Sequence, residues 1–185
     1  RETDPRRVAL MGISFGGYFA TRIAAHEPRV RALIANSPIV DLHAYMVSFV
    51  GFDPAEMPDA QDIRLADVDH IPPSVLPPQT REMMRNLMLR RGQPSFKQTY
   101  RRLRDFRVSD DDLRRIRCPT LALVGQGEGK EPLAQHAHFL QTVGGPSASH
   151  VFTVEEGADG HCQIGNLAYS AAVSMDWLDE LFAVR

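Results

Sequence analysis

Apolar runs and helical repeats alternate along the first forty residues of this 185-residue chain. Residues 8–11 form a short apolar run that is typical of a buried strand in a parallel sheet. The apolar residues that follow recur near helical spacing until Pro28, which stops a helix. A second apolar run occupies residues 30–36. This part of the chain therefore predicts a strand, a helix and a second strand.

The alternation breaks off and then returns near residue 118. Between residues 41 and 117 the pattern predicts several helical stretches interrupted by prolines, with no convincing strand. The elements predicted after this segment are a strand at 119–125, a helix at 131–143, a strand at 150–154 and a final helix at 166–183. We therefore divide the chain into core residues 1–40, a helical insertion 41–117 and core residues 118–185.

Strands that alternate with helices indicate an α/β fold, in which helices cover both faces of a parallel sheet. Ligands of such sheets bind outside the carboxyl ends of the strands. We expect the insertion at 41–117 to lie above those ends, where it would act as a lid.

Ser14 lies between Gly12 and Gly16, in the G-x-S-x-G spacing of a nucleophile elbow. A strand that turns abruptly into a helix brings two backbones close together, so we expect a Cβ at either glycine to collide. The turn holds the hydroxyl beside the first N–H groups of a helix, where negative charge is stabilised. An ordinary glycine-rich turn is the alternative, but the predicted strand and helix on either side favour a nucleophile.

A serine nucleophile needs a base within reach and an acid that orients the base. In hydrolases with this elbow both partners follow the serine along the chain. Glu128 comes just after the strand predicted at 119–125, in a loop with glycines, and is our candidate for the acid. Asp159 and Glu131 are its rivals, and a solvated loop glutamate is the alternative interpretation of Glu128.

His161 is our candidate for the general base because it lies in a glycine-flanked loop after the last predicted strand. We interpret the other histidines as surface or hydrogen-bonded core residues; they are His26, His43, His70, His136, His138 and His150. We expect no metal and no cofactor, because no cysteine or carboxylate cluster accompanies His136 and His138 at ligand spacing.

The composition, 43% hydrophobic and 24% charged with a net charge of −2, is that of a folded soluble domain. Neither a membrane span nor a signal peptide is indicated, so we expect a cytoplasmic protein with two reduced cysteines. The overall acidity argues against nucleic-acid binding. Residues 81–117 carry twelve basic and five acidic residues, which indicates either attraction for an anionic substrate or a solvated helical face.

Four segments together resemble the α/β-hydrolase superfamily: residues 12–18, 35–41, 124–129 and 155–163. More narrowly, they are similar to its lidded branch, which includes dipeptidyl-peptidase and acylaminoacyl-peptidase catalytic domains, fermentation-respiration-switch-like proteins and carbon–carbon bond hydrolases. Many relatives carry aspartate where this chain has Glu128.

The resemblance implies a serine hydrolase that transfers an acyl group from an ester, an amide or a ketone-activated C–C bond of a small molecule. Ser14, His161 and Glu128 would form the triad, and the Phe15 N–H would belong to the oxyanion hole. A serine peptidase and a catalytically silent interaction domain are the alternatives.

The chain departs from the family at its start. In these hydrolases the elbow follows the fifth strand of an eight-stranded sheet, whereas only a few residues precede the first strand predicted here. We therefore expect a C-terminal piece of a longer hydrolase. A missing N-terminal half or a second copy of the chain would then cover the open edge of the sheet.

Overall fold

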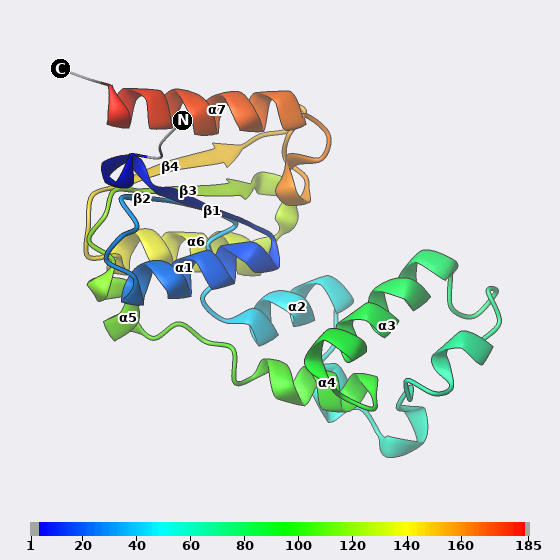
Figure 1. Cartoon of the computed structure of the whole chain (residues 1–185). Coiled ribbons are helices and arrows are strands. Elements are labelled where there is room, and N and C mark those ends of the chain that lie inside the picture. The colour runs from blue at the N-terminus through cyan, green and yellow to red at the C-terminus, as the bar shows by residue number, and fades with distance from the viewer. Residues whose placement is uncertain (1–3, 184–185) are drawn as a thin grey trace. The chain divides into compact units, whose positions relative to one another are not determined.

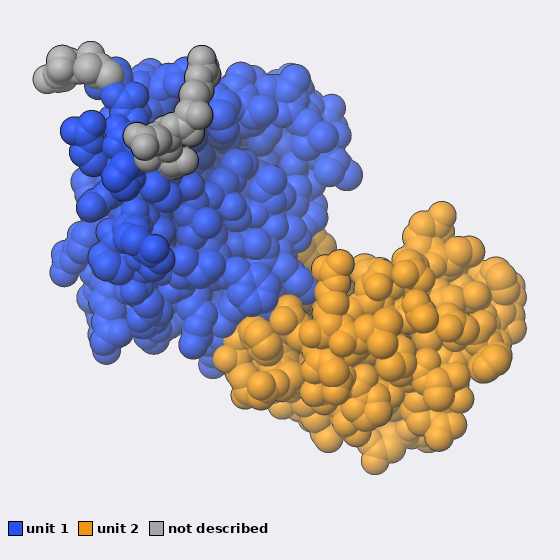
Figure 2. Space-filling view, in the orientation of Figure 1, with its two compact units in different colours: residues 1–45, 107–185 blue, residues 46–106 orange. Residues whose placement is uncertain are grey.

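The computed structural model describes residues 4–183 and divides the chain into two compact units (Figure 2). The first unit comprises residues 1–45 and 107–185, and the second comprises residues 46–106. The second unit lies within the range 41–117 expected for the insertion but is shorter at both ends. Its role as a lid stays a prediction.

A four-stranded parallel sheet forms the centre of the first unit. Its strands are β1 (Ala9–Ile13), β2 (Ala32–Asn36), β3 (Thr120–Gly125) and β4 (Ser147–Phe152), which lie side by side in that order. The sequence predicted all four, but β4 begins three residues before the predicted position 150. Its first residues alternate between exposed and half-buried. Because an edge strand of this kind has no continuous apolar run, its start could not be predicted from one.

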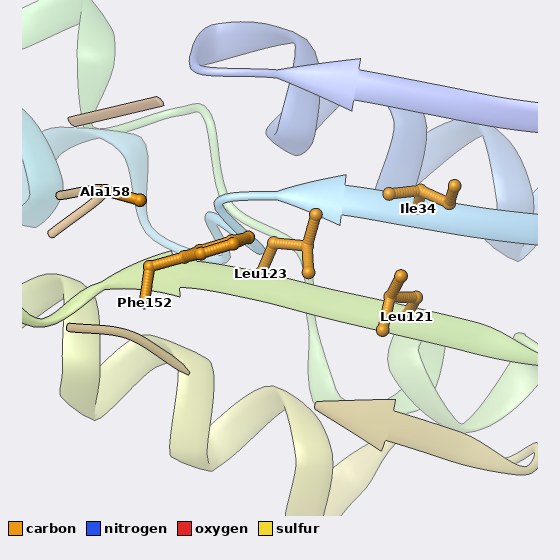
Figure 3. Packing of buried hydrophobic residues seen from close by; sticks show 5 residues of the cluster. All are labelled: Ile34, Leu121, Leu123, Phe152 and Ala158. Atoms are coloured by element: carbon orange, nitrogen blue, oxygen red, sulfur yellow. The ribbon is translucent and has the colours of Figure 1, made fainter. Parts of the chain in front are cut away.

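Helices cover both faces of this sheet, as predicted (Figure 1). On one face, α1 (Phe15–His26) packs against β1 and β2, and α6 (Lys130–Thr142) packs against β3 and β4. On the other face, residues of α7 (Leu167–Phe182) pack against a cluster of buried residues. The cluster, drawn as sticks in Figure 3, consists of Ile34, Leu121, Leu123, Phe152 and Ala158. A shorter helix, α5 (Asp110–Arg115), precedes β3.

The prediction that β1 is a buried strand is wrong. Met11 and Ile13 are 38% and 51% exposed, whereas every residue of β2 and β3 is buried. Among residues 4–183, β1 pairs only with β2 and therefore forms an edge of the sheet. Phe19 and Ile23 of α1 are also exposed. The apolar run of β1 thus lies at an open sheet edge in the described chain.

The second unit is helical, as predicted, and none of its residues lies in a named strand. The chain enters it along α2 (Leu42–Val50), and it also contains α3 (Pro78–Arg91) and α4 (Phe96–Leu103). Three short 3-10 segments lie between α2 and α3: Pro54–Glu56, Asp59–Gln61 and Val68–His70. Gly92 ends α3 with φ of 62°, and the Ser95 side chain caps the start of α4.

Acidic partners within the second unit offset its basic residues. Lys97 contacts Asp59 at 2.6 Å, and Arg104 contacts Asp53 at 2.9 Å and Glu56 at 2.6 Å. Residues 46–106 carry nine basic and eight acidic side chains. Residues 81–117 nevertheless keep their excess of basic over acidic side chains, so both interpretations of that segment stay predictions.

Among residues 4–183, no helix combines the length and the apolar composition needed to cross a lipid bilayer.

Replacement of Phe152 by alanine should destabilise the first unit by about 3–5 kcal/mol, because it leaves a cavity beneath α7. Phe19→Ala is the matched control. Phe19 is 41% exposed, so its removal should cost about 1 kcal/mol or less. Urea unfolding of the two variants measures both changes. Equal losses of stability would show that the cluster around Phe152 is not the core.

Candidate active site

Ser14 occupies the sharp turn between β1 and α1 in a strained backbone conformation. Its φ and ψ are 57° and −125°, a region that residues other than glycine rarely adopt. Two hydrogen bonds hold the turn: the Ser14 N–H donates to the Asn36 carbonyl at 2.6 Å, and the Gly17 N–H donates to the Ser14 carbonyl at 2.8 Å. The turn places the serine side chain at the carboxyl end of β1.

The glycines around this turn do not all have the role that the sequence predicted. A Cβ on Gly12 would lie 2.0 Å from the Gly16 carbonyl oxygen, which confirms the expected collision. A Cβ on Gly16 would meet nothing within 4 Å, so the steric role predicted for Gly16 is wrong. Gly17 fulfils that role instead, because its Cβ would lie 1.9 Å from the Ser37 carbonyl oxygen. The close approach on the helix side is therefore between α1 and the end of β2.

The structure brings the three predicted site residues together. His161 lies in a short 3-10 segment, His161–Gln163, beyond β4. Its Nε2 is 3.0 Å from the Ser14 hydroxyl oxygen, and its Nδ1 is 2.9 Å from Glu128 Oε2. The ring is partly open to solvent, because the side chain is 37% exposed. A hydroxyl, an imidazole and a carboxylate thus form one hydrogen-bonded chain.

Glu128 lies in the 3-10 segment Gln126–Glu128, directly after β3, and its side chain is fully buried. Its Oε1 accepts from the Gly125 N–H at 2.9 Å and from the Ser37 hydroxyl at 3.0 Å. Its Oε2 accepts from the Tyr45 hydroxyl at 2.6 Å in addition to His161. Burial opposes ionisation, but the hydrogen bonds from His161, Gly125 and Tyr45 hold the pKa of Glu128 below its ordinary value. Glu128 is therefore a carboxylate that can accept a hydrogen bond from the Nδ1–H of His161.

Glu128, and not a rival acid, is the carboxylate at His161 Nδ1. The Glu131 carboxylate accepts from the Gln135 side chain at 2.9 Å, and the contact of Asp159 with the Gly127 N–H, at 2.9 Å, is made by its backbone carbonyl. Among the six histidines assigned structural roles, His26 and His138 lie beside Asp112 and Asp110. His136 is buried near the Ala122 carbonyl. Within residues 4–183, no three His, Cys, Asp or Glu side chains gather in a way that could hold a metal ion.

Sequence reasoning missed three side chains at this site: Ser37, Tyr45 and Cys162. Ser37 follows β2, so the rule that parallel strands end at one edge could have indicated it. No spacing or motif connects Tyr45 to the acid loop. Cys162 was expected only as one of two reduced cysteines; it is a free, half-buried thiol whose sulfur lies 3.2 Å from His161 Nε2.

Cys162 contacts the same ring nitrogen as Ser14. Its backbone has φ of 53°, which turns the chain directly after His161. The hydrogen bonds of His161 with Cys162 and with Glu128 raise the pKa of His161 to about 10, because both partners favour the imidazolium form. An imidazole that is protonated at neutral pH cannot accept a proton from Ser14. The contact with Cys162 therefore raises the pH at which His161 would be neutral and able to act as a base.

Comparison with protein-family models identifies the family of the chain. A family model described as the Alpha/beta hydrolase family matches residues 1–169. The chain belongs to the alpha/beta hydrolase family. No curated protein sequence matches it.

Solved structures of other hydrolases share this fold. The chain superposes on 2,6-dihydroxy-pseudo-oxynicotine hydrolase with a TM-score of 0.63 and 24% identity, covering 97% of this chain and 42% of that one. For the meta-cleavage product hydrolase of Pseudomonas fluorescens IP01 the TM-score is 0.55 and the identity 15%, with 95% and 66% covered. For a Pyrococcus furiosus esterase the values are 0.53 and 13%, with 95% and 54% covered. The chain thus spans less than half the length of the first of these hydrolases.

Gly12→Ala should destabilise the protein by about 1–3 kcal/mol or more, because the new methyl group meets the Gly16 carbonyl. Gly16→Ala adds the same methyl group in open space and should leave stability unchanged or slightly improved. Thermal unfolding of the two variants provides the comparison. Equal tolerance at both positions would contradict the close packing of β1 on α1.

Cys162→Ala should lower the pKa of His161, because it removes the larger of the two contributions that raise it. The neutral base is then populated at lower pH, so the pH midpoint of Ser14 reactivity should move downward. The pH dependence of the labelling rate with a fluorophosphonate measures this midpoint. Cys118→Ala, at the half-buried cysteine before β3, is the control and should leave it unchanged. An unmoved midpoint in Cys162→Ala would show that the thiol does not act on the ring.

Proposed function

We propose that this alpha/beta hydrolase is a serine hydrolase that cleaves an ester, an amide or a ketone-activated carbon–carbon bond of a small molecule by acyl transfer. The observation that carries the proposal is the chain of contacts from Ser14 through His161 to Glu128, at 3.0 Å and 2.9 Å. Both distances are within the reach that a nucleophile and its base require. The esterase and the other hydrolases of similar fold support the same reaction class.

The geometry assigns a role to each group. The Ser14 oxygen attacks the substrate carbonyl carbon while its proton passes to His161 Nε2. Glu128 stabilises the imidazolium that forms. When the tetrahedral intermediate collapses, the bond to the leaving group breaks and that group takes the proton from Nε2. Water then attacks the acyl-enzyme, again giving a proton to His161, and Ser14 is regenerated.

Negative charge on the tetrahedral oxygen requires donors beside the serine. Phe15 is the first residue of α1 and follows Ser14 directly, so its N–H belongs to the positive end of the helix dipole. We assign this N–H to the oxyanion hole. Each such donor is worth about 10²–10³ in turnover.

A fluorophosphonate probe tests the proposal because it phosphonylates only an activated serine. We expect labelling of the purified protein at Ser14, located by peptide mass spectrometry, and none in Ser14→Ala. Glu128→Gln should slow labelling by about 10⁴-fold, since a neutral amide no longer holds the ring in the required tautomer. Glu131→Gln is the matched control and should react like the parent.

Two further outcomes distinguish the alternatives. Folded protein that is not labelled at any pH up to 10 would favour a catalytically silent interaction domain. Release of amine from peptides without hydrolysis of aryl esters would instead favour a peptidase.

A further inference from the structure

Tyr45 contacts both the acid and the base of the proposed relay. Its hydroxyl lies 2.6 Å from Glu128 Oε2 and 3.2 Å from His161 Nδ1. We propose that Tyr45, together with Ser37, is a positioning residue that holds the Glu128 carboxylate and fixes the Nδ1–H tautomer of His161. This inference rests on the proposed function, because it concerns the direction in which protons move through that site.

The hydrogen-bond capacities of the three groups determine that direction. An ionised carboxylate can only accept, so the single hydroxyl hydrogen of Tyr45 points to Glu128. The lone pairs of the same hydroxyl then face Nδ1. An unprotonated Nδ1 would turn its own lone pair toward those lone pairs and toward the carboxylate, and this contact would be repulsive. The proton of the neutral ring therefore belongs on Nδ1. This leaves the Nε2 lone pair for the proton of Ser14.

Burial keeps this arrangement constant over the working pH range. Tyr45 and Ser37 are each 1% exposed. Burial, followed by the neighbouring charge of Glu128, raises the pKa of Tyr45, so its hydroxyl stays a donor. Ser37 contacts both carboxylate oxygens, at 3.0 Å and 3.2 Å, and restrains rotation of the carboxylate.

The support behind Tyr45 is also rigid. Gln135 of α6 is 5% exposed, and its side-chain oxygen accepts from the N–H groups of Val40 and Asp41 at 2.8 Å and 3.0 Å. Its amide nitrogen donates to the Asp41 carbonyl at 2.9 Å. The Tyr45 N–H in turn donates to the same carbonyl at 3.0 Å. One buried glutamine thus fixes the backbone at the start of α2, from which the tyrosine ring extends.

The charge balance predicts a distinctive effect on the base. The titratable side chains that contact His161 include Tyr45 from α2, Glu128 from the segment after β3, and the adjacent Cys162. The donor on Tyr45 withdraws charge from Glu128 Oε2. The Tyr45 oxygen also faces Nδ1, but that contact, at 3.2 Å, is longer than the 2.6 Å hydrogen bond to Glu128, so the effect on the carboxylate dominates. Loss of the hydroxyl would leave the carboxylate a stronger partner for the imidazolium, and the pKa of His161 would rise.

Tyr45→Phe tests the proposal because it removes one hydroxyl and keeps the buried ring. At the high-pH plateau, the rate of Ser14 labelling by the fluorophosphonate should fall by about ten- to a hundredfold. A fall of this size corresponds to the loss of one hydrogen bond to a charged group. The pH midpoint of labelling should rise by roughly half to one unit. Ser37→Ala should change both quantities in the same directions. Tyr100→Phe, at a tyrosine in α4 that is 0% exposed, is the matched control and should change neither.

A second measurement needs no variant. In protein labelled with ¹⁵N-histidine, the ring of His161 should show its proton on Nδ1 when neutral, as a hydrogen-bonded resonance that Tyr45→Phe weakens. A proton on Nε2 would overturn the proposal, as would an unchanged midpoint and rate in folded Tyr45→Phe. If the parent protein is not labelled at Ser14 at all, the proposed function fails, whereas the tautomer of His161 still tests the role of Tyr45.

Discussion

The pairing of buried Glu128 with His161 is the interaction on which the rest of the site depends. A carboxylate withdrawn from water is costly unless hydrogen bonds replace its hydration. Here the replacement comes from separate segments: the Gly125 N–H at the end of β3, Ser37 after β2, Tyr45 on α2 and His161 beyond β4. The same hydrogen bonds that stabilise the buried charge also orient the carboxylate toward the imidazole. One set of contacts therefore both satisfies the Glu128 carboxylate and positions the His161 ring.

The parallel sheet makes this convergence achievable. All four strands run in one direction, so their carboxyl ends share an edge. Ser14 follows β1, Ser37 follows β2, Glu128 follows β3, and His161 lies beyond β4. Ser14 and His161 are 147 positions apart in the sequence but 3.0 Å apart in space. The strained turn at Ser14 completes the site, and packing of α1 against β1 and Ser37 maintains it.

Several features of the fold were accessible from local pattern. Apolar runs located the strands, Pro28 located the end of the first helix, and the elbow spacing singled out Ser14 as the candidate nucleophile before any partner was known. The exposure of β1 could not be predicted, because a run of apolar residues is the same in a central strand as in an edge strand. The function of Gly16 was misjudged for a related reason: the turn needs close approach at Gly12 and Gly17, and only the path of the neighbouring strand reveals which glycine faces it.

By itself, the sequence determined the order of the elements and the α/β class, and it indicated which residues are candidates for the nucleophile, the base and the acid. Those features follow from short-range periodicity and from what the chemistry demands of particular residues. Only the tertiary structure decided which acid contacts His161, that Tyr45 and Ser37 share that carboxylate, and that Cys162 competes with Ser14 for one ring nitrogen. The reason is physical. Such contacts depend on distances of a few ångströms between segments far apart in the chain, and strand pairing with helix packing sets those distances.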